Sequence, residues 1–103
     1  MRSGFERDGF LVVPEFKSSA EIAALRARAA AIVDAFDPAE PSAIFTTRDG
    51  STTSEAYFLT SGDKVRCFFE EEAFDASGAL RRRKELSINK IGHAMHDLDP
   101  VFE

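Results

Sequence analysis

The segment Ser87–Glu103, SINKIGHAMHDLDPVFE, concentrates the potential metal ligands of the chain. It holds both histidines, His93 and His96, together with the carboxylates Asp97 and Asp99. Two imidazoles and one carboxylate form the ligand set of many non-haem iron sites. If the segment is helical, residues three apart lie on one face. His93, His96 and Asp99 therefore raise the hypothesis of a self-contained metal site.

The spacing of these groups favours another interpretation. The chain has no H-E-x-x-H sequence, which would place two ligands on one helix face with a base between them, and no H-x-D step. Asp97 adjoins His96 and would point to a different side of the helix. We therefore predict no metal ligand and no catalytic residue in this chain. One histidine would pack or hydrogen-bond, and the other would be exposed.

A lysine in the same segment is the more informative group. The pattern predicts a helix over Ser87–Leu98, with an apolar stripe formed by Ile88, Ile91, Met95 and Leu98. Lys90 would lie in its first turn and share a face with His93. The N-terminal end of a helix carries partial positive charge, so a cation there suits a bound anion better than empty solvent. Lys90 is either an anion contact or an ordinary surface lysine, and spacing does not separate the two.

Two possible nucleophiles have structural interpretations. Cys67 alternates with polar residues in KVRCF, which predicts a half-buried strand with the thiol on its apolar side. Ser61 lies in T-S-G-D, which is not the G-x-S-x-G sequence of a nucleophile elbow.

The first half of the chain predicts a short strand followed by a long helix. Phe10–Val13 is a continuous apolar run and reads as a strand buried on both faces. An amphipathic helix is predicted over Ser18–Phe36, because Ser18 and Glu21 have the spacing of a capping box. Asp37-Pro38 would end this helix.

The second half predicts mostly extended and loop structure. Pro38–Ser54 has the composition of a loop, and two extended segments flank Ser61-Gly62-Asp63. Phe74–Leu80 is a predicted hairpin tip, and the basic cluster Arg81–Lys84 is interpreted as a solvated loop. Asp99-Pro100 has the residue pair of a new helix start.

Composition places the chain among small globular proteins with short strands and helices. Its 103 residues predict one domain, and its net charge of −5 with a pI near 5.0 disfavours nucleic acid as a partner. The single cysteine excludes an internal disulfide and fits a reducing compartment. The N-terminal residues show no apolar signal segment, and no apolar run has the length of a membrane span. We expect a cytoplasmic α+β protein without a membrane segment.

Three sequence blocks resemble one enzyme family. FERDGFLVVPEF followed by SSAEIAAL is similar to the opening of phytanoyl-CoA dioxygenase family proteins. YFLTSGDKVRCFFEE and SINKIGHAMHDLDPVFE are similar to the branch called phytanoyl-CoA dioxygenase domain-containing proteins. The family consists of oxygenases that depend on Fe(II) and 2-oxoglutarate.

The resemblance implies a double-stranded β-helix, or jelly roll, of which residues 1–103 would be the N-terminal segment. The family's iron ligands, an H-x-D pair and a distant histidine, would lie beyond this segment, so the barrel here would be incomplete. Lys90 matches the family lysine that contacts 2-oxoglutarate. The whole protein would hydroxylate a small organic or acyl substrate and release succinate and CO₂. The segment alone is expected to hold neither iron nor 2-oxoglutarate productively.

A second hypothesis comes from the unusual load of ten phenylalanines. The chain would then be a small non-catalytic α+β interaction module or subunit, with exposed Phe faces that pair with a partner. The sequence does not predict its oligomeric state or the identity of the substrate.

Overall fold

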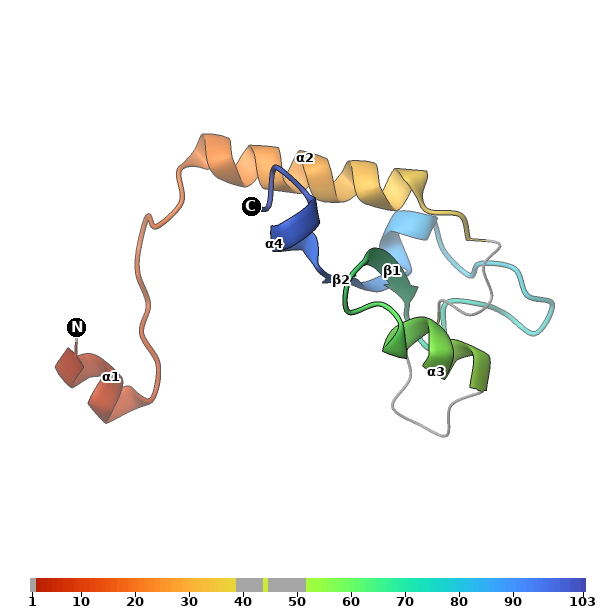
Figure 1. The fold of residues 1–103 in the computed structure, drawn as a ribbon, viewed down its shortest axis with the longest axis horizontal. Helices are drawn as coiled ribbons and strands as arrows, with labels where there is room; N and C mark the ends of the chain where they lie inside the picture. The colour runs from red at the N-terminus through yellow and green to blue at the C-terminus, as the bar shows by residue number, and fades with distance from the viewer. Residues whose placement is uncertain (1, 39–43, 45–51) are drawn as a thin grey trace.

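The computed structural model describes residues 2–38, 44 and 52–103, and it has the α+β character that the sequence predicts. The elements in chain order are α1 (Arg2–Asp8), α2 (Ser19–Ala35), α3 (Thr52–Leu59), β1 (Val65–Phe69), the 3₁₀ helix η2 (Lys84–Leu86), β2 (Ile88–His93) and α4 (Met95–Leu98). Figure 1 shows α1 set apart from the rest, at the end of an extended segment. Helix α2 runs along one side of the molecule, and the sheet lies between α2 and α3.

The cap of α2 confirms the predicted helix start. The Ser18 hydroxyl accepts the backbone N–H of Glu21 at 3.2 Å, and the Glu21 carboxylate accepts the backbone N–H of Ser18 at 2.8 Å. These two bonds satisfy backbone donors that have no partner within the helix. The Ser18 backbone bond is the main reason why the pKa of Glu21 falls to about 2, and the Ser18 hydroxyl and Lys17 add to the shift.

The other end of α2 is held by a distant lysine. The Lys84 ammonium donates to the carbonyls of Asp34 at 2.7 Å and Phe36 at 2.8 Å. Carbonyls at a helix C-terminus carry partial negative charge, so a cation is well placed there. Lys84 therefore departs from the solvated loop predicted for Arg81–Lys84, whereas the three arginines before it are exposed as expected.

Only part of the predicted apolar stripe of α2 is buried. Val33 is buried and Phe36 is half-buried, but Ile22 near the N-terminus is 44% exposed. The C-terminal half of the helix therefore packs on the core, while its N-terminal half extends beyond it (Figure 1).

The predicted strand over Phe10–Val13 is wrong. These residues form no regular structure, and Phe10 and Val12 are 63% and 70% exposed. A strand needs a neighbour for its backbone hydrogen bonds. Within the described residues the one named sheet has two strands, β1 and β2, and this segment is not part of it.

Strands β1 and β2 pair antiparallel, with Val65 opposite His93, Cys67 opposite Ile91 and Phe68 opposite Lys90. The register shifts between Phe68 and Phe69, so that Phe69 lies opposite Ile88. The strand predicted around Cys67 is confirmed, although Phe68 is buried along with its neighbours rather than exposed.

Two of the predicted elements have the wrong type. The extended segment predicted before Ser61 is the end of helix α3, and the helix predicted over Ser87–Leu98 is strand β2 followed by the short helix α4. In β2 the backbone groups bond to β1 instead of to their own helix turn. Most of the predicted loop Pro38–Ser54 lies outside the described residues, and its last residues belong to α3.

A small aromatic core forms on the Phe69 end of the sheet. Phe69 is fully buried and packs against Phe36 and Phe74, with ring centroids 5.3 and 4.9 Å away. An antiparallel bridge joins Phe74 to Leu80, which confirms the predicted hairpin tip. Gly78 in this turn has a φ of +83°, which glycine adopts without steric cost.

The C-terminal residues return to α2. Asp99 is 4% exposed and accepts a hydrogen bond from the Arg28 guanidinium. Its other carboxylate oxygen accepts the N–H of Val101 at 3.0 Å. Burial raises the pKa of Asp99, but the Arg28 pair and the backbone N–H groups outweigh it, so the pKa lies below its ordinary value. The helix predicted to start at Pro100 is a turn.

The capping box predicts a pH dependence of stability. The pKa of Glu21 is about 2 in the folded chain, against an ordinary value of 4.5, so its contribution is complete above pH 4.5 and is lost as the pH falls toward 2. Replacing Glu21 by Gln keeps a capping side chain but removes this titration. The slope of unfolding free energy against pH measures how many protons the chain takes up when it unfolds. We expect this number to be smaller in Glu21→Gln by up to about one proton in this pH window.

Urea unfolding of the full-length protein at a series of pH values measures this slope. Glu15→Gln, at a carboxylate outside the helix, is the matched control and should keep the wild-type slope. Equal slopes for wild type and Glu21→Gln would contradict the role given to the capping box.

Candidate functional site

Lys90 lies in the middle of β2, not at the start of a helix. Its ammonium nitrogen is 4.5 Å from the ring centroid of Phe58 and 5.1 Å from that of Phe68. Phe68 is its cross-strand neighbour, and Phe58 comes from α3. Lys90 is therefore not in the first turn of a helix, and the prediction that placed it there is wrong. The half-buried cation is held instead by the faces of two aromatic rings.

Helix α3 is fixed to β1 by polar contacts that place Phe58 over the lysine. The Tyr57 hydroxyl donates to the carbonyl of Cys67 at 3.1 Å. The Arg66 guanidinium donates to the carbonyl of Tyr57 at 2.7 Å and lies over the Tyr57 ring at 4.5 Å. The Tyr57 ring in turn packs edge-on against Phe68, with centroids 5.1 Å apart.

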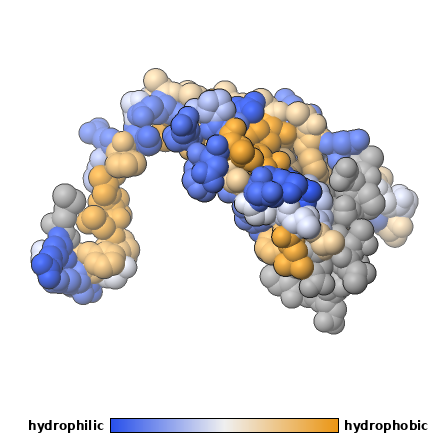
Figure 2. Space-filling view, viewed as in Figure 1, coloured by the Kyte–Doolittle hydropathy of each residue, from blue (hydrophilic) through white to orange (hydrophobic). Residues whose placement is uncertain are grey.

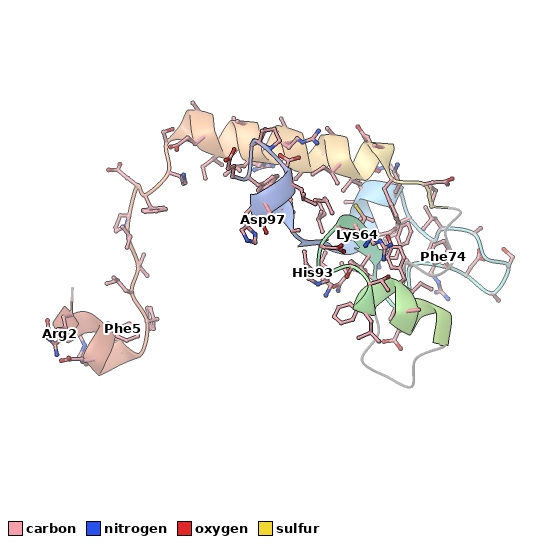
Figure 3. All side chains as sticks on the ribbon, in the orientation of Figure 1. Arg2, Phe5, Lys64, Phe74, His93 and Asp97 are labelled. Atoms are coloured by element: carbon pink, nitrogen blue, oxygen red, sulfur yellow. The ribbon has the colours of Figure 1, made fainter. Side chains whose placement is uncertain are left out.

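His93 contacts the same two rings as Lys90. Its ring centroid is 5.4 Å from that of Phe58 and 5.8 Å from that of Phe68. The sequence predicted that Lys90 and His93 share a face, and both do lie on the Phe58–Phe68 pair, although on a strand and not on a helix. Figure 3 shows His93 near Lys64 and the end of β2.

Ser61 anchors the His93 ring from inside the protein. Ser61 is fully buried, and its hydroxyl oxygen is 2.8 Å from Nδ1 of His93. The same hydroxyl donates to the carbonyl of Phe58. One histidine, His93, is thus hydrogen-bonded, as the sequence predicted, but His93 and His96 are both exposed residues.

The histidine-based metal site is wrong for the part of the chain that the structure describes. His96 lies 3.5 Å from the Asp97 carboxylate on the surface, Asp99 is paired with Arg28, and His93 is bonded to Ser61. Figure 3 shows His93 and Asp97 on separate elements. Among the described residues no group of three or more His, Cys, Asp or Glu side chains could hold a metal ion. These residues do not fit an iron centre.

The other nucleophile candidate is a structural residue. Cys67 is 1% exposed, and burial raises the pKa of its thiol. A buried, protonated thiol is a poor nucleophile, so the predicted packing role is supported.

A hollow lies on the α2 side of the sheet. It has a volume of about 380 Å³. Arg28 and Ile32 of α2 and the following Phe36 line one side, and Val65 and Cys67 of β1 line the other. Figure 2 shows an apolar area beneath α2. Arg28 and Arg66, which also line this hollow, are bound to Asp99 and to the carbonyl of Tyr57.

A family model for phytanoyl-CoA dioxygenase (PhyH) matches residues 5–103, which is nearly the whole chain. The chain belongs to the phytanoyl-CoA dioxygenase family. It is 46% identical over 99 residues to "Phytanoyl-CoA dioxygenase 1" of rice (Oryza sativa subsp. japonica), covering 96% of this chain and 34% of the relative. It is 45% identical over 105 residues to "Phytanoyl-CoA dioxygenase domain-containing protein 1 homolog" of Caenorhabditis elegans, covering 100% of this chain and 36% of the relative.

The family resemblance read from the three sequence blocks is thus confirmed. The chain spans about a third of the length of the phytanoyl-CoA dioxygenase relatives that it matches. None of the helices in the described part of the chain combines the length and apolar character needed to cross a bilayer.

Two residues at this site were missed by the sequence reasoning. The sequence predicts an extended segment at Phe58 and offers Ser61 only as a possible nucleophile. Neither residue has a local signal in the sequence. Phe58 reaches Lys90 through the packing of α3 on β1, and Ser61 and His93 are 32 residues apart in the sequence.

The position of Phe68 predicts a large loss of stability on truncation. Phe68 is fully buried and contacts Tyr57, Phe58, Lys90 and His93. We expect Phe68→Ala to lower the free energy of unfolding by about 3–5 kcal/mol, because it leaves a cavity at the centre of these contacts. Phe68→Leu should cost clearly less, since most of the volume is kept. Chemical denaturation of the full-length protein measures both, and a loss below about 1 kcal/mol for the alanine variant would contradict the central position of Phe68.

Proposed function

We propose that residues 1–103 form the N-terminal segment of a single oxygenase domain that depends on Fe(II) and 2-oxoglutarate. The whole protein would insert one oxygen atom of O₂ into a C–H bond of a small organic or acyl substrate. The other oxygen atom would enter 2-oxoglutarate, which leaves as succinate and CO₂. The match to the family over residues 5–103 supports this proposal.

Among the individual residues, Lys90 gives the proposal its strongest support. Its ammonium is half-buried on two aromatic rings, where fewer water molecules compete for it than at an open surface. A carboxylate placed there gains a charge-assisted hydrogen bond. We assign Lys90 to a carboxylate of 2-oxoglutarate, in agreement with the SINKIGH motif on which the family resemblance depends.

The rest of the site would come from the part of the relatives that this chain does not match. The described residues do not fit an iron centre, and a two-stranded sheet is a small part of a jelly roll. The iron, when bound by the whole protein, supplies the activation of O₂. What this chain contributes is the lysine and the aromatic pair that holds it.

The exposed apolar surface supports the same proposal. Val12 and Phe16 before α2 are 70% and 76% exposed, and Figure 2 shows a continuous apolar arm between α1 and α2. Such a surface is typical of an interface. We propose that the remainder of the domain packs against this apolar surface. The alternative, a free-standing interaction module, would place another protein there.

The role of Lys90 is tested by replacing it with methionine, which keeps an unbranched side chain over the rings but removes the charge. We expect Lys90→Met to weaken 2-oxoglutarate binding by about 10- to 100-fold, the value of one hydrogen bond between charged groups. Metal affinity should change much less. The measurement is an anaerobic titration of the full-length protein with Fe(II) and 2-oxoglutarate.

Lys64→Met is the matched control, because Lys64 lies just before β1 and is paired with Asp63. It should leave 2-oxoglutarate affinity unchanged. Equal affinity for the wild type and Lys90→Met would show that Lys90 is an ordinary surface residue.

Experiments on the isolated chain of 103 residues distinguish the two hypotheses, an oxygenase segment and a free-standing interaction module. We expect no charge-transfer band when this chain is titrated with Fe(II) and 2-oxoglutarate under argon, and a broad, associating species by light scattering. A stable, monodisperse folded species would favour the interaction module, and a charge-transfer band would show that the ligands lie within this chain.

A further inference from the structure

The hydrogen bonds of Ser61 determine which nitrogen of His93 carries a proton. A serine hydroxyl has one proton to donate. Ser61 donates it to the carbonyl of Phe58, so its oxygen faces Nδ1 of His93 with a lone pair. Nδ1 must therefore be the donor of the 2.8 Å bond. In a neutral imidazole the other nitrogen, Nε2, is then a hydrogen-bond acceptor.

The imidazole is held in place but reaches the surface. Its inner nitrogen is bonded to the fully buried Ser61, and its sides contact the rings of Phe58 and Phe68. His93 as a residue is nevertheless exposed. Within the part of the chain that the structure describes, the ring's one hydrogen bond is that to Ser61. Three contacts thus orient an accessible imidazole whose outer nitrogen is an acceptor.

The neighbouring groups define what this acceptor would bind. Lys90 lies on the same two rings and offers N–H donors, which suit a carboxylate. The lone pair on Nε2 of His93 repels a carboxylate and suits a hydroxyl or an amide N–H. Phe58 is 37% exposed and adds apolar surface next to both groups.

We propose that His93 is a specificity-determining residue, whose Nε2 accepts a hydrogen bond from a hydroxyl or amide N–H of the organic substrate. An apolar part of that substrate would rest on Phe58. Ser61 is a positioning residue that fixes the tautomer. The assignment of the adjacent Lys90 to 2-oxoglutarate rests on the proposed function, whereas the tautomer of His93 does not.

The tautomer is tested by nitrogen-15 NMR of the full-length protein labelled at histidine. The resonances of His93 are those that disappear in His93→Asn. We expect a protonated Nδ1 and an unprotonated Nε2 in the wild type, and a loss of this preference in Ser61→Ala. A protonated Nε2 in the neutral wild-type ring would overturn the proposal, whether or not Ser61→Ala folds.

The ligand class is tested with two small probes of similar size, butanamide and butanoate. They are added with 2-oxoglutarate saturating and Zn(II) in place of Fe(II). Butanamide should shift the Nε2 resonance of His93, because its N–H groups can donate to the lone pair. Butanoate, which only accepts, should not. An equal or larger shift with butanoate, or no shift with either, would overturn the proposal.

Two substitutions at His93 separate its inner and outer nitrogens. Asparagine can keep a donor near Ser61 but lacks the outer nitrogen, whereas the glutamine amide reaches the position of Nε2. We expect butanamide to bind about fivefold or more weakly to His93→Asn and to keep more of its affinity for His93→Gln, as for the loss of one neutral hydrogen bond. Both variants should bind 2-oxoglutarate within about twofold of the wild type. Unchanged butanamide affinity in His93→Asn would overturn the proposal.

Failure of the proposed function gives a different pattern. In that case Lys90→Met would leave 2-oxoglutarate affinity unchanged, while the tautomer and the butanamide response of His93 would remain. If only the role of His93 is wrong, Lys90→Met still weakens 2-oxoglutarate binding, but butanamide does not shift the Nε2 resonance of His93.

Discussion

The antiparallel pairing of β1 with β2 is the constraint on which the rest of the structure depends. It places Phe68 opposite Lys90, two residues that are 22 positions apart in the sequence. The hydroxyl of Tyr57 and the guanidinium of Arg66 then bind α3 to β1, which brings Phe58 over the same lysine. A shift of one residue in the strand register would turn Lys90 to the opposite face of the sheet.

The aromatic pair offsets the solvation free energy that Lys90 loses on partial burial. Partial burial of an ammonium group costs solvation free energy. A lysine over an aromatic face recovers about 0.5–2 kcal/mol, depending on how far it is desolvated. Lys90 lies on two such faces, from Phe58 and Phe68. The rings therefore hold the cation in place without neutralising its charge.

The sequence predicted those features that depend on a few adjacent residues. The cap formed by Ser18 and Glu21 and the turn from Phe74 to Leu80 were correct, because their partners lie three to six positions apart. The sequence did not predict β2, because the spacing of its isoleucines also fits a helix, and the decisive partner is a distant strand. The 2-oxoglutarate contact of Lys90 stays a prediction, and the helix predicted around it is wrong. The bond between Ser61 and His93 is a product of tertiary packing, which periodicity does not encode.

The attachment of α2 has a consequence for how the molecule responds to its medium. Among the described residues, two cationic side chains tie α2 to other parts of the chain besides its apolar contacts: Arg28 binds Asp99, and Lys84 binds the carbonyls of Asp34 and Phe36. Electrostatic contacts near the surface weaken with salt, whereas buried aromatic packing does not. Each face of the sheet is thus held by both kinds of contact: Arg28 and Lys84 act beside the Phe36–Phe69 pair on the α2 side, and Arg66 acts beside the Tyr57–Phe68 pair on the α3 side. Added salt weakens the cationic share of both attachments and leaves the aromatic share in place.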